Sequence, residues 1–110
     1  MTIFTKIINK EIPAKLVFED DQCIAFHDIH PQAPVHVLLV PKKPIDSLAA
    51  MGPEDQALMG HLMLKVGEIA RSLGIEEKGY RVVTNIGDEG GQSVRHLHFH
   101  IVGGRQMGGF

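Results

Sequence analysis

The segment from Gly91 to Val102, GQSVRHLHFHIV, has a histidine at every second position, namely His96, His98 and His100. Successive side chains of a β-strand point to opposite faces, so a strand here would carry all three imidazoles on one face. The other face would carry the intervening apolar residues, Leu97, Phe99 and Ile101. We therefore expect a strand whose apolar side chains face the core and whose histidines face a surface or a cleft.

Three kinds of site could use this row of imidazoles. A solvated polar face normally mixes Lys, Glu, Thr and Ser, so three identical side chains do not fit it well. Zinc could be chelated by two neighbouring histidines, with His36 or His30 completing the site. The backbones of His96 and His100 would lie ~13 Å apart on a straight strand, however, so both would have to lean steeply toward one ion. Phosphate chemistry fits better, because imidazoles can supply both a nucleophile and hydrogen-bond donors.

The loop before the histidines supports phosphate chemistry. Its sequence, GDEGGQS over residues 87–93, is rich in glycine, which lets backbone N–H groups approach an anion closely. Ser93 adds a hydroxyl next to the strand. No Lys-Ser/Thr pair follows the glycines, so this is not a Walker A loop. The loop and the alternating histidines together predict a phosphate site.

The composition limits the classes of function. The 110 residues suit one domain spanning 1–110, with 22% charged residues and a net charge of −2. Without a basic surplus we expect no nucleic-acid partner. No apolar window approaches ~18 residues, so we expect no membrane span. The single cysteine, Cys23, excludes an intramolecular disulfide and indicates a cytoplasmic protein, and its apolar surroundings predict a small buried side chain.

The pattern of apolar and turn residues predicts an α+β fold with short antiparallel connections. The expected elements are a hairpin of strands at 14–20 and 22–28 turning at Asp20-Asp21, strands at 35–40 and 80–86, a long helix from Pro53 to a cap at Gly74, the histidine strand, and a short helix near 3–9.

The long helix has an unusually wide apolar face. Its stripe comprises Leu58, Leu62, Val66, Ile69 and Leu73, and Met59, Met63 and Ala70 widen it. Either the helix buries a second side against another subunit, where Gly60 and Gly67 would permit a close contact, or it lies deep in its own core. The pattern favours neither.

HLHFHIV matches the His-φ-His-φ-His-φ-φ signature of the histidine-triad superfamily, where φ is an apolar residue. The segments 3–45 and 85–107 also resemble the two halves of its Hint branch, the histidine-triad nucleotide-binding proteins. The resemblance implies a five-stranded antiparallel sheet with one long helix and a short N-terminal helix. It also implies a homodimer whose two sheets join into ten strands.

The resemblance further implies a hydrolase that cleaves the P–N bond of purine nucleoside 5′-phosphoramidates, and also aminoacyl adenylates, to AMP or GMP. His98 would be the nucleophile and would form a nucleotidyl-histidine intermediate. His100 and His36 would hold the phosphate, His96 would support them, and Ser93 would contact the phosphate or the leaving group. No cofactor and no metal are expected.

The remaining binding residues also follow from the resemblance. Asp28 would accept hydrogen bonds from the ribose hydroxyls, with an ordinary turn carboxylate as the alternative. The apolar walls around the base would be Ile3, Phe4, Ile7, Phe26 and Ile29, although plain core packing is the alternative. Residues near the phosphate or ribose would be Asn85, Gly91, Gln92 and Ser93. We expect His61 to be structural or exposed, and neither His27 nor His30 to be catalytic.

Two other functions stay open. One is a nucleotide-binding or partner-binding module with incidental turnover, and the other is a dinucleoside polyphosphate hydrolase. The tail GGRQMGGF lacks the tryptophan of a common eukaryotic form, which leaves the preference for a leaving group open.

Overall fold

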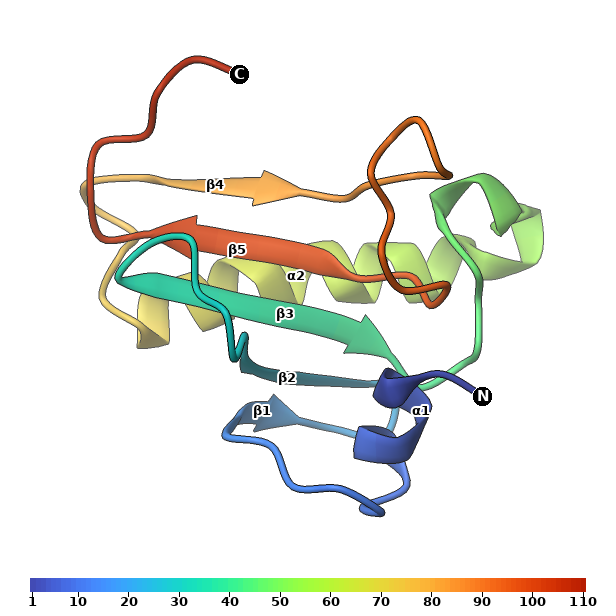
Figure 1. Ribbon diagram of the computed structural model, residues 1–110. Helices are drawn as coiled ribbons and strands as arrows, with labels where there is room; N and C mark the ends of the chain where they lie inside the picture. The colour runs from blue at the N-terminus through green and yellow to red at the C-terminus, as the bar shows by residue number, and fades with distance from the viewer.

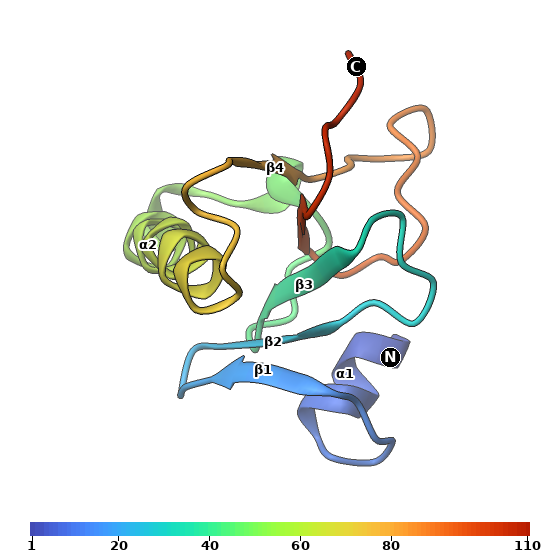
Figure 2. The same ribbon diagram turned by 90° about the vertical axis from the view of Figure 1, so that its left-hand side faces the viewer.

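Two helices lie on opposite faces of a five-stranded sheet in the computed structural model, which describes all of residues 1–110 (Figures 1 and 2). The elements are α1 (Ile3–Ile8), β1 (Leu16–Glu19), β2 (Cys23–His27), β3 (Val35–Pro41), α2 (Gln56–Ser72), β4 (Tyr80–Val83) and β5 (Phe99–Gly103), with 3₁₀ turns at Leu48–Ala50 and Pro53–Asp55. All strand pairs are antiparallel, in the order β1-β2-β3-β5-β4. The expected α+β fold is confirmed.

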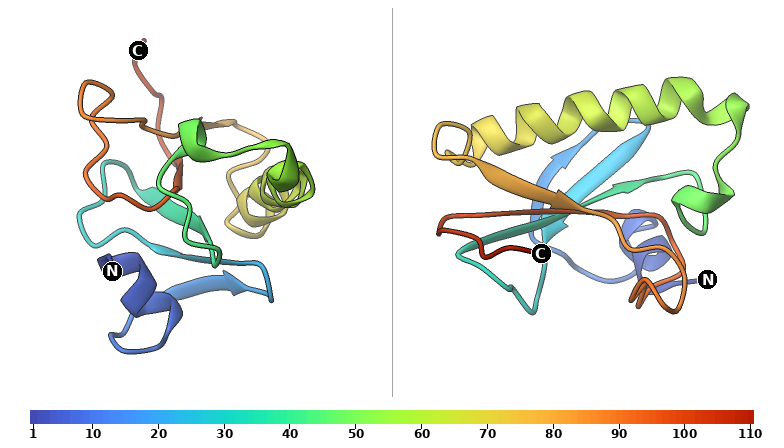
Figure 3. Two further views of the ribbon diagram at one scale, coloured as in Figure 1. Left: turned by 90° about the vertical axis from the view of Figure 1, so that its right-hand side faces the viewer. Right: turned by 90° about the horizontal axis from the view of Figure 1, so that it is seen from above.

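Each face of the sheet has its own apolar core. The α2 side holds Cys23, Ala25, Val37, Leu39, Leu62, Val66, Ile69, Phe99 and Ile101 among its buried residues. The α1 side holds Phe4, Ile7, Ile24, Phe26, Leu38 and Val40. The view from above shows the sheet between the two helices (Figure 3). Both faces of the sheet are covered, and β2 and β3 are accordingly apolar except for His27 at the end of β2 and His36 in β3.

The predicted β1–β2 hairpin and its turn are confirmed. Asp20 closes the turn, since its Oδ1 accepts hydrogen bonds from the backbone N–H groups of Gln22 and Cys23, both at 2.8 Å. Cys23 is 0% exposed. Its burial, followed by the neighbouring Asp20 carboxylate, raises the pKa of the Cys23 thiol to about 12. The thiol is therefore protonated at neutral pH, which agrees with the predicted buried side chain.

The long helix is confirmed with a later start. Residues Pro53–Asp55 form a 3₁₀ turn, and α2 follows from Gln56. Gly74 has φ of +74°, which suits a glycine after the last turn. The wide apolar face divides in two: Leu62 is 0% exposed against the sheet, whereas Met63, one of the residues that widen the face, is 41% exposed. Neither helix combines the length and the hydrophobicity that crossing a membrane requires.

The strands of the hairpin, β4 and the histidine strand are all shorter than expected. β4 ends at Val83, not at Ile86, and the histidine strand β5 begins only at Phe99. The segment before β5 is held by other hydrogen bonds, from Leu97 N–H to the Ile45 carbonyl at 2.7 Å and from the Thr84 hydroxyl to the His98 carbonyl at 2.8 Å. The expected alternation still holds, because Leu97, Phe99 and Ile101 all lie in the core under α2.

Leu62→Ala should lower the free energy of unfolding by about 2–5 kcal/mol, because it leaves a cavity between α2 and the sheet. The matched control is Leu16→Ala on the edge strand β1, where the side chain is half exposed and the loss should be about 1 kcal/mol or less. Urea denaturation measures both. Equal losses for the two variants would contradict this packing.

Candidate active site

Four imidazoles gather on the face of the sheet that α1 covers. His36 lies on β3, His100 lies on β5, and His96 and His98 lie just before β5. The register sets Leu38 opposite His100 and Val102 opposite His36, so His36 and His100 are diagonal neighbours. The ring centroids of His36 and His98 each lie 5.1 Å from that of His100. The sheet thus joins the triad to a histidine that lies 64 residues before His100 in the sequence.

A chain of hydrogen bonds fixes the protons of His36 and His100. The Gln32 backbone N–H donates to Nδ1 of His36 at 2.9 Å. The neutral His36 ring therefore carries its proton on Nε2, which lies 2.9 Å from Nδ1 of His100 and donates to it. The neutral His100 ring in turn carries its proton on Nε2. The Nε2–H group of His100 is therefore a hydrogen-bond donor that no other group in the chain accepts from.

The tautomer of His98 is fixed by a backbone carbonyl. Its Nδ1 lies 2.7 Å from the oxygen of His96, so Nδ1 carries the proton and Nε2 keeps its lone pair. The residue is 4% exposed. Every side-chain nitrogen or oxygen that is cut off from solvent has a hydrogen-bond partner. Nε2 of His98 has no such partner, so this atom must be in contact with solvent. His98 presents a bare nitrogen through a small opening.

His96 is held away from any reacting position. Its Nε2 donates to the carbonyl of Pro41 at 2.8 Å, and the ring is almost fully buried. The Phe4 ring of α1 lies 6.2 Å from the His96 ring and 4.9 Å from the His98 ring, edge-on to both. The expected histidine face is therefore largely covered and not open, because α1 packs Phe4 over it. The alternation in the sequence predicted that the histidines share one face, but it did not predict that Phe4 packs over that face.

Burial favours the neutral rings of His98 and His100. Desolvation is the main cause that lowers the pKa of His98, and the His96 carbonyl opposes it. Burial, and then the neighbouring His98 and His36 rings, lower the pKa of His100 to about 4. Both rings are thus unprotonated at neutral pH. A neutral His98 is a competent nucleophile.

Asp28 follows β2 and lies beside the histidines. Its Oδ1 accepts the His30 backbone N–H at 2.8 Å, and its Oδ2 lies 3.4 Å from Nε2 of His36. The two side chains border a cleft of about 750 Å³. The other residues lining the cleft are Pro13, Ala14, Lys15, His27, Ile29, Pro31 and Pro34. None of Pro13, Ala14, Lys15 and His27 was singled out as a binding residue from the sequence.

Asp28, His36 and His100 each bring a potential metal ligand within 4.8 Å of the others. A metal on Nε2 of His36 would require the ring proton on Nδ1, where the Gln32 N–H already points. The hydrogen-bond chain therefore suits a ring that donates from Nε2 and not one that binds a cation there.

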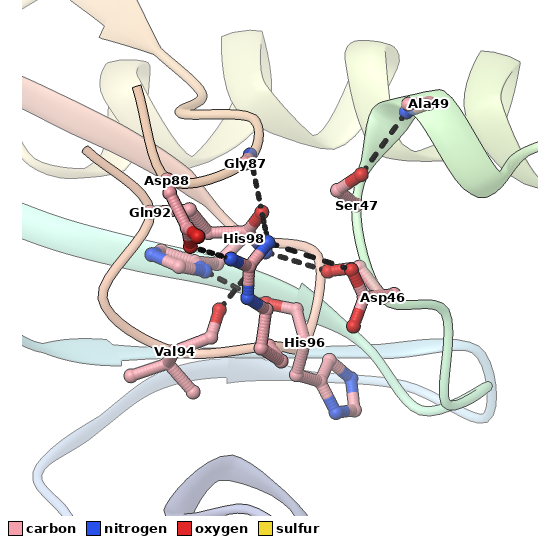
Figure 4. Close-up of polar contacts among 10 residues, drawn as sticks. Asp46, Ser47, Ala49, Gly87, Asp88, Gln92, Val94, His96 and His98 are labelled. Atoms are coloured by element: carbon pink, nitrogen blue, oxygen red, sulfur yellow. Dashed lines mark hydrogen bonds and ion pairs between the residues drawn. The ribbon is translucent and has the colours of Figure 1, made fainter. Parts of the chain in front are cut away.

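Gln92 braces the glycine-rich loop (Figure 4). Its Oε1 accepts the Gly87 N–H at 2.9 Å, and its Nε2 donates to the carbonyls of Asp46 at 2.6 Å and Val94 at 3.0 Å. Its backbone N–H is also used, on the Gly87 carbonyl. Gln92 can thus affect a ligand through the shape of the loop, a role for which its sequence position gave no signal.

Other loop residues are placed by the same turn. Asn85 donates from Nδ2 to the Gly90 carbonyl at 2.8 Å, and Gly91 has φ of +79°. A Cβ at Gly90 would lie 2.1 Å from the Ile86 carbonyl oxygen, so only glycine fits there. Ser93 is exposed, and its N–H donates to no backbone carbonyl. The loop therefore leaves the N–H and hydroxyl of Ser93 accessible to a ligand.

The residues expected as base walls fall into two groups. Phe4, Ile7 and Phe26 are buried together in the core under α1. Ile3 is half exposed, and Ile29, at the cleft, is 81% exposed. The first group packs the site from behind, and the second offers free apolar surface.

Residues 9–107 match the HIT domain family. The chain belongs to the HIT-domain family. It is 62% identical to an uncharacterized HIT-like protein of Synechocystis over 94% of this chain and 90% of the relative. A crystal structure of a HIT family hydrolase from Legionella pneumophila matches with a TM-score of 0.96 and 44% identity, covering 98% and 96% of the two chains. A histidine triad nucleotide-binding protein from Candida albicans matches with a TM-score of 0.83 and 34% identity, covering 92% and 73%. These matches confirm the family inferred from the histidine pattern.

Stability should fall in acid because of His100. Its pKa is about 4 in the folded protein and ~6.5 when unfolded, so between these values the unfolded chain binds the extra proton. This contribution is complete above pH ~6.5 and is lost as the pH falls toward 4. The free energy of unfolding of the natural protein should therefore fall more steeply over this range than that of His100→Gln, as urea denaturation at several pH values would show. Parallel curves would contradict the assigned shift.

Proposed function

We propose that this protein hydrolyses purine nucleoside 5′-phosphoramidates, and also aminoacyl adenylates, to the nucleoside monophosphate. The observation that carries the proposal is the His98 ring, whose Nδ1 proton is held by the His96 carbonyl while Nε2 keeps its lone pair. The relatives support the class of reaction, since the Legionella protein is described as a hydrolase and the Candida protein as nucleotide-binding.

The reaction proceeds in two displacements. Nε2 of His98 attacks the α-phosphorus, the P–N bond breaks, and the departing amine takes a proton from the Ser93 hydroxyl or from water. The ring then carries the nucleotidyl group on Nε2 and its original proton on Nδ1, where the His96 carbonyl stabilises the positive charge. Water attacks phosphorus next and returns its proton to the Ser93 oxygen or to solvent, the bond to Nε2 breaks, and AMP or GMP leaves.

The negative phosphate oxygens are met by neutral donors. His100 offers its Nε2 proton, which the chain from Gln32 through His36 leaves unused. Ser93 offers its N–H and its hydroxyl. The His100 donor is held by the Gln32–His36 chain before the substrate arrives, so it needs little reorganisation as charge shifts in the transition state.

The nucleoside lies in the cleft beside the histidines. Asp28 accepts hydrogen bonds from the ribose hydroxyls, and the exposed Ile29 and Ile3 pack against the purine. Asn85, Gly91 and Gln92 shape the loop near the phosphate and ribose.

The proposed assembly is a homodimer, and the proposed location is the cytoplasm. The exposed Met63 and Leu64 of α2 and the edge strand β4, with its exposed Val82, form the surface that a second copy would cover. Pairing of two β4 edges would give a ten-stranded sheet.

His98→Ala should lower turnover of an adenosine 5′-phosphoramidate with a fluorescent amine by at least about a thousandfold, because the nucleophile is lost. AMP affinity should change little. The control His61→Gln, on α2, should keep its rate, and treatment with EDTA should leave the natural rate unchanged.

A fully active His98→Ala protein would overturn the nucleophile assignment. Inactivity of the natural protein with AMP still bound would favour a binding module, or a hydrolase of dinucleoside polyphosphates, which the same assay would then test directly.

Asp28→Asn should lower kcat/KM for the ribonucleotide substrate by about 10–100-fold, because hydrogen bonds to a charged acceptor are lost. The matched comparison is the 2′-deoxy substrate, which already lacks one of the hydroxyls. Asp28→Asn should therefore cost the deoxy substrate less. An equal loss for both substrates would mean that Asp28 acts on the fold and not on the ribose.

A further inference from the structure

Three different metal-binding side chains meet on the other face of the sheet, away from the histidine site. Asp20 lies in the β1–β2 turn, Cys23 begins β2, and His61 lies on α2. Nε2 of His61 is 2.6 Å from Oδ2 of Asp20, and the thiol, carboxylate and ring nitrogen all lie within 4.8 Å of one another. Nothing in the proposed reaction uses this cluster.

The cluster is open on one side and closed beneath. The Asp20 and His61 side chains are about a quarter exposed, at 23% and 24%. The Cys23 side chain is fully buried under them, in the core between α2 and the sheet. An ion arriving from solvent would therefore meet the carboxylate and the imidazole first and the sulfur last.

We propose that Asp20, Cys23 and His61 bind a zinc ion, with water as the fourth ligand. Sulfur, imidazole nitrogen and carboxylate oxygen are the three ligand types that zinc takes in proteins. A thiolate also selects zinc over calcium or magnesium, which prefer oxygen.

The surroundings of the cluster suit a cation. Oδ1 of Asp20 accepts the backbone N–H groups of Gln22 and Cys23, which fixes the carboxylate and directs Oδ2 at His61. The ammonium groups of Lys42 and Lys65 lie near Cys23 and would repel an ion, but a carboxylate beside each one reduces the repulsion. Lys42 pairs with Glu19 at 2.8 Å, and Lys65 pairs with Glu68 at 2.7 Å.

Binding requires small movements and two changes in protonation. Ligand atoms of a tetrahedral zinc lie ~3.3–3.8 Å apart, so the Asp20–His61 pair opens by less than ~1.5 Å as the thiol approaches. The Cys23 thiol releases its proton to solvent as the S–Zn bond forms. His61 gives up the Nε2 proton and carries its proton on Nδ1, so Nε2 can bind zinc.

The consequence is a cross-link between the hairpin and the helix. Asp20 and Cys23 belong to β1–β2 and His61 belongs to α2, which are otherwise joined here by side-chain packing and one hydrogen bond. An ion that binds only the folded chain raises its stability by mass action.

Zinc titration of the metal-free full-length protein tests the site, by competition with a chromophoric chelator and by thermal denaturation. Cobalt serves as a second probe, because a thiolate ligand gives a charge-transfer absorption band. The variants are Cys23→Ser and, if that protein folds poorly, His61→Gln on the helix surface. The matched control is His100→Gln, which breaks the other cluster of possible ligands, around Asp28 and His36.

The proposal expects one zinc per chain, a rise in Tm with zinc and a cobalt–thiolate band. Loss of either ligand should weaken zinc binding by at least ~10-fold, since even outer partners of a metal are worth that much. His100→Gln should bind as the natural protein does. Undiminished binding in Cys23→Ser and His61→Gln, loss of binding in His100→Gln, or no binding at micromolar zinc would each overturn it.

Discussion

Hydrogen bonds to the backbone determine which nitrogen of each histidine carries a proton, and the chemistry of the site depends on this. The His96 carbonyl holds the proton of His98 on Nδ1, and the Gln32 N–H sets the proton of His36 on Nε2. The Nε2 proton of His36 is in turn donated to Nδ1 of His100, which leaves the proton of His100 on its Nε2. Reversal of either tautomer would turn the nucleophile into a donor or the donor into an acceptor.

Burial strengthens the hydrogen bonds of this network, although it would penalise any polar group left without a partner. α1 places Phe4 against His98, and Leu38 lies opposite His100 in the sheet, so the rings are largely removed from water. In such surroundings the neutral rings are favoured and each hydrogen bond is stronger than in solvent. Every side-chain nitrogen or oxygen that is cut off from solvent has a partner, and Nε2 of His98 and Nε2 of His100 are left free for a ligand. The proposed nucleophile, Nε2 of His98, thus owes its lone pair to packing and to the His96 carbonyl, and not to an adjacent base.

Local patterns in the sequence predicted the elements, and long-range contacts explain what the patterns missed. Alternation over residues 96–101 separated the apolar side chains from the imidazoles because the pleat continues even where regular pairing stops. The start of β5 at Phe99 could not be foreseen, since it depends on the distant carbonyls of Pro41 and Ile45. The family resemblance pointed to His36 and Asp28. The sequence pattern did not indicate Gln32 or Thr84. Gln32 acts through its backbone N–H, which any residue would supply, and the Thr84 hydroxyl donates to the backbone carbonyl of His98.

The tautomers themselves can be measured most directly by long-range ¹H–¹⁵N NMR correlation of the imidazoles in ¹⁵N-labelled protein at neutral pH. The account predicts a proton on Nδ1 and a bare Nε2 for His98, with the proton on Nε2 for both His36 and His100. A proton on Nε2 of His98, or a doubly protonated His98 ring, would leave no lone pair to attack phosphorus and would contradict the mechanism.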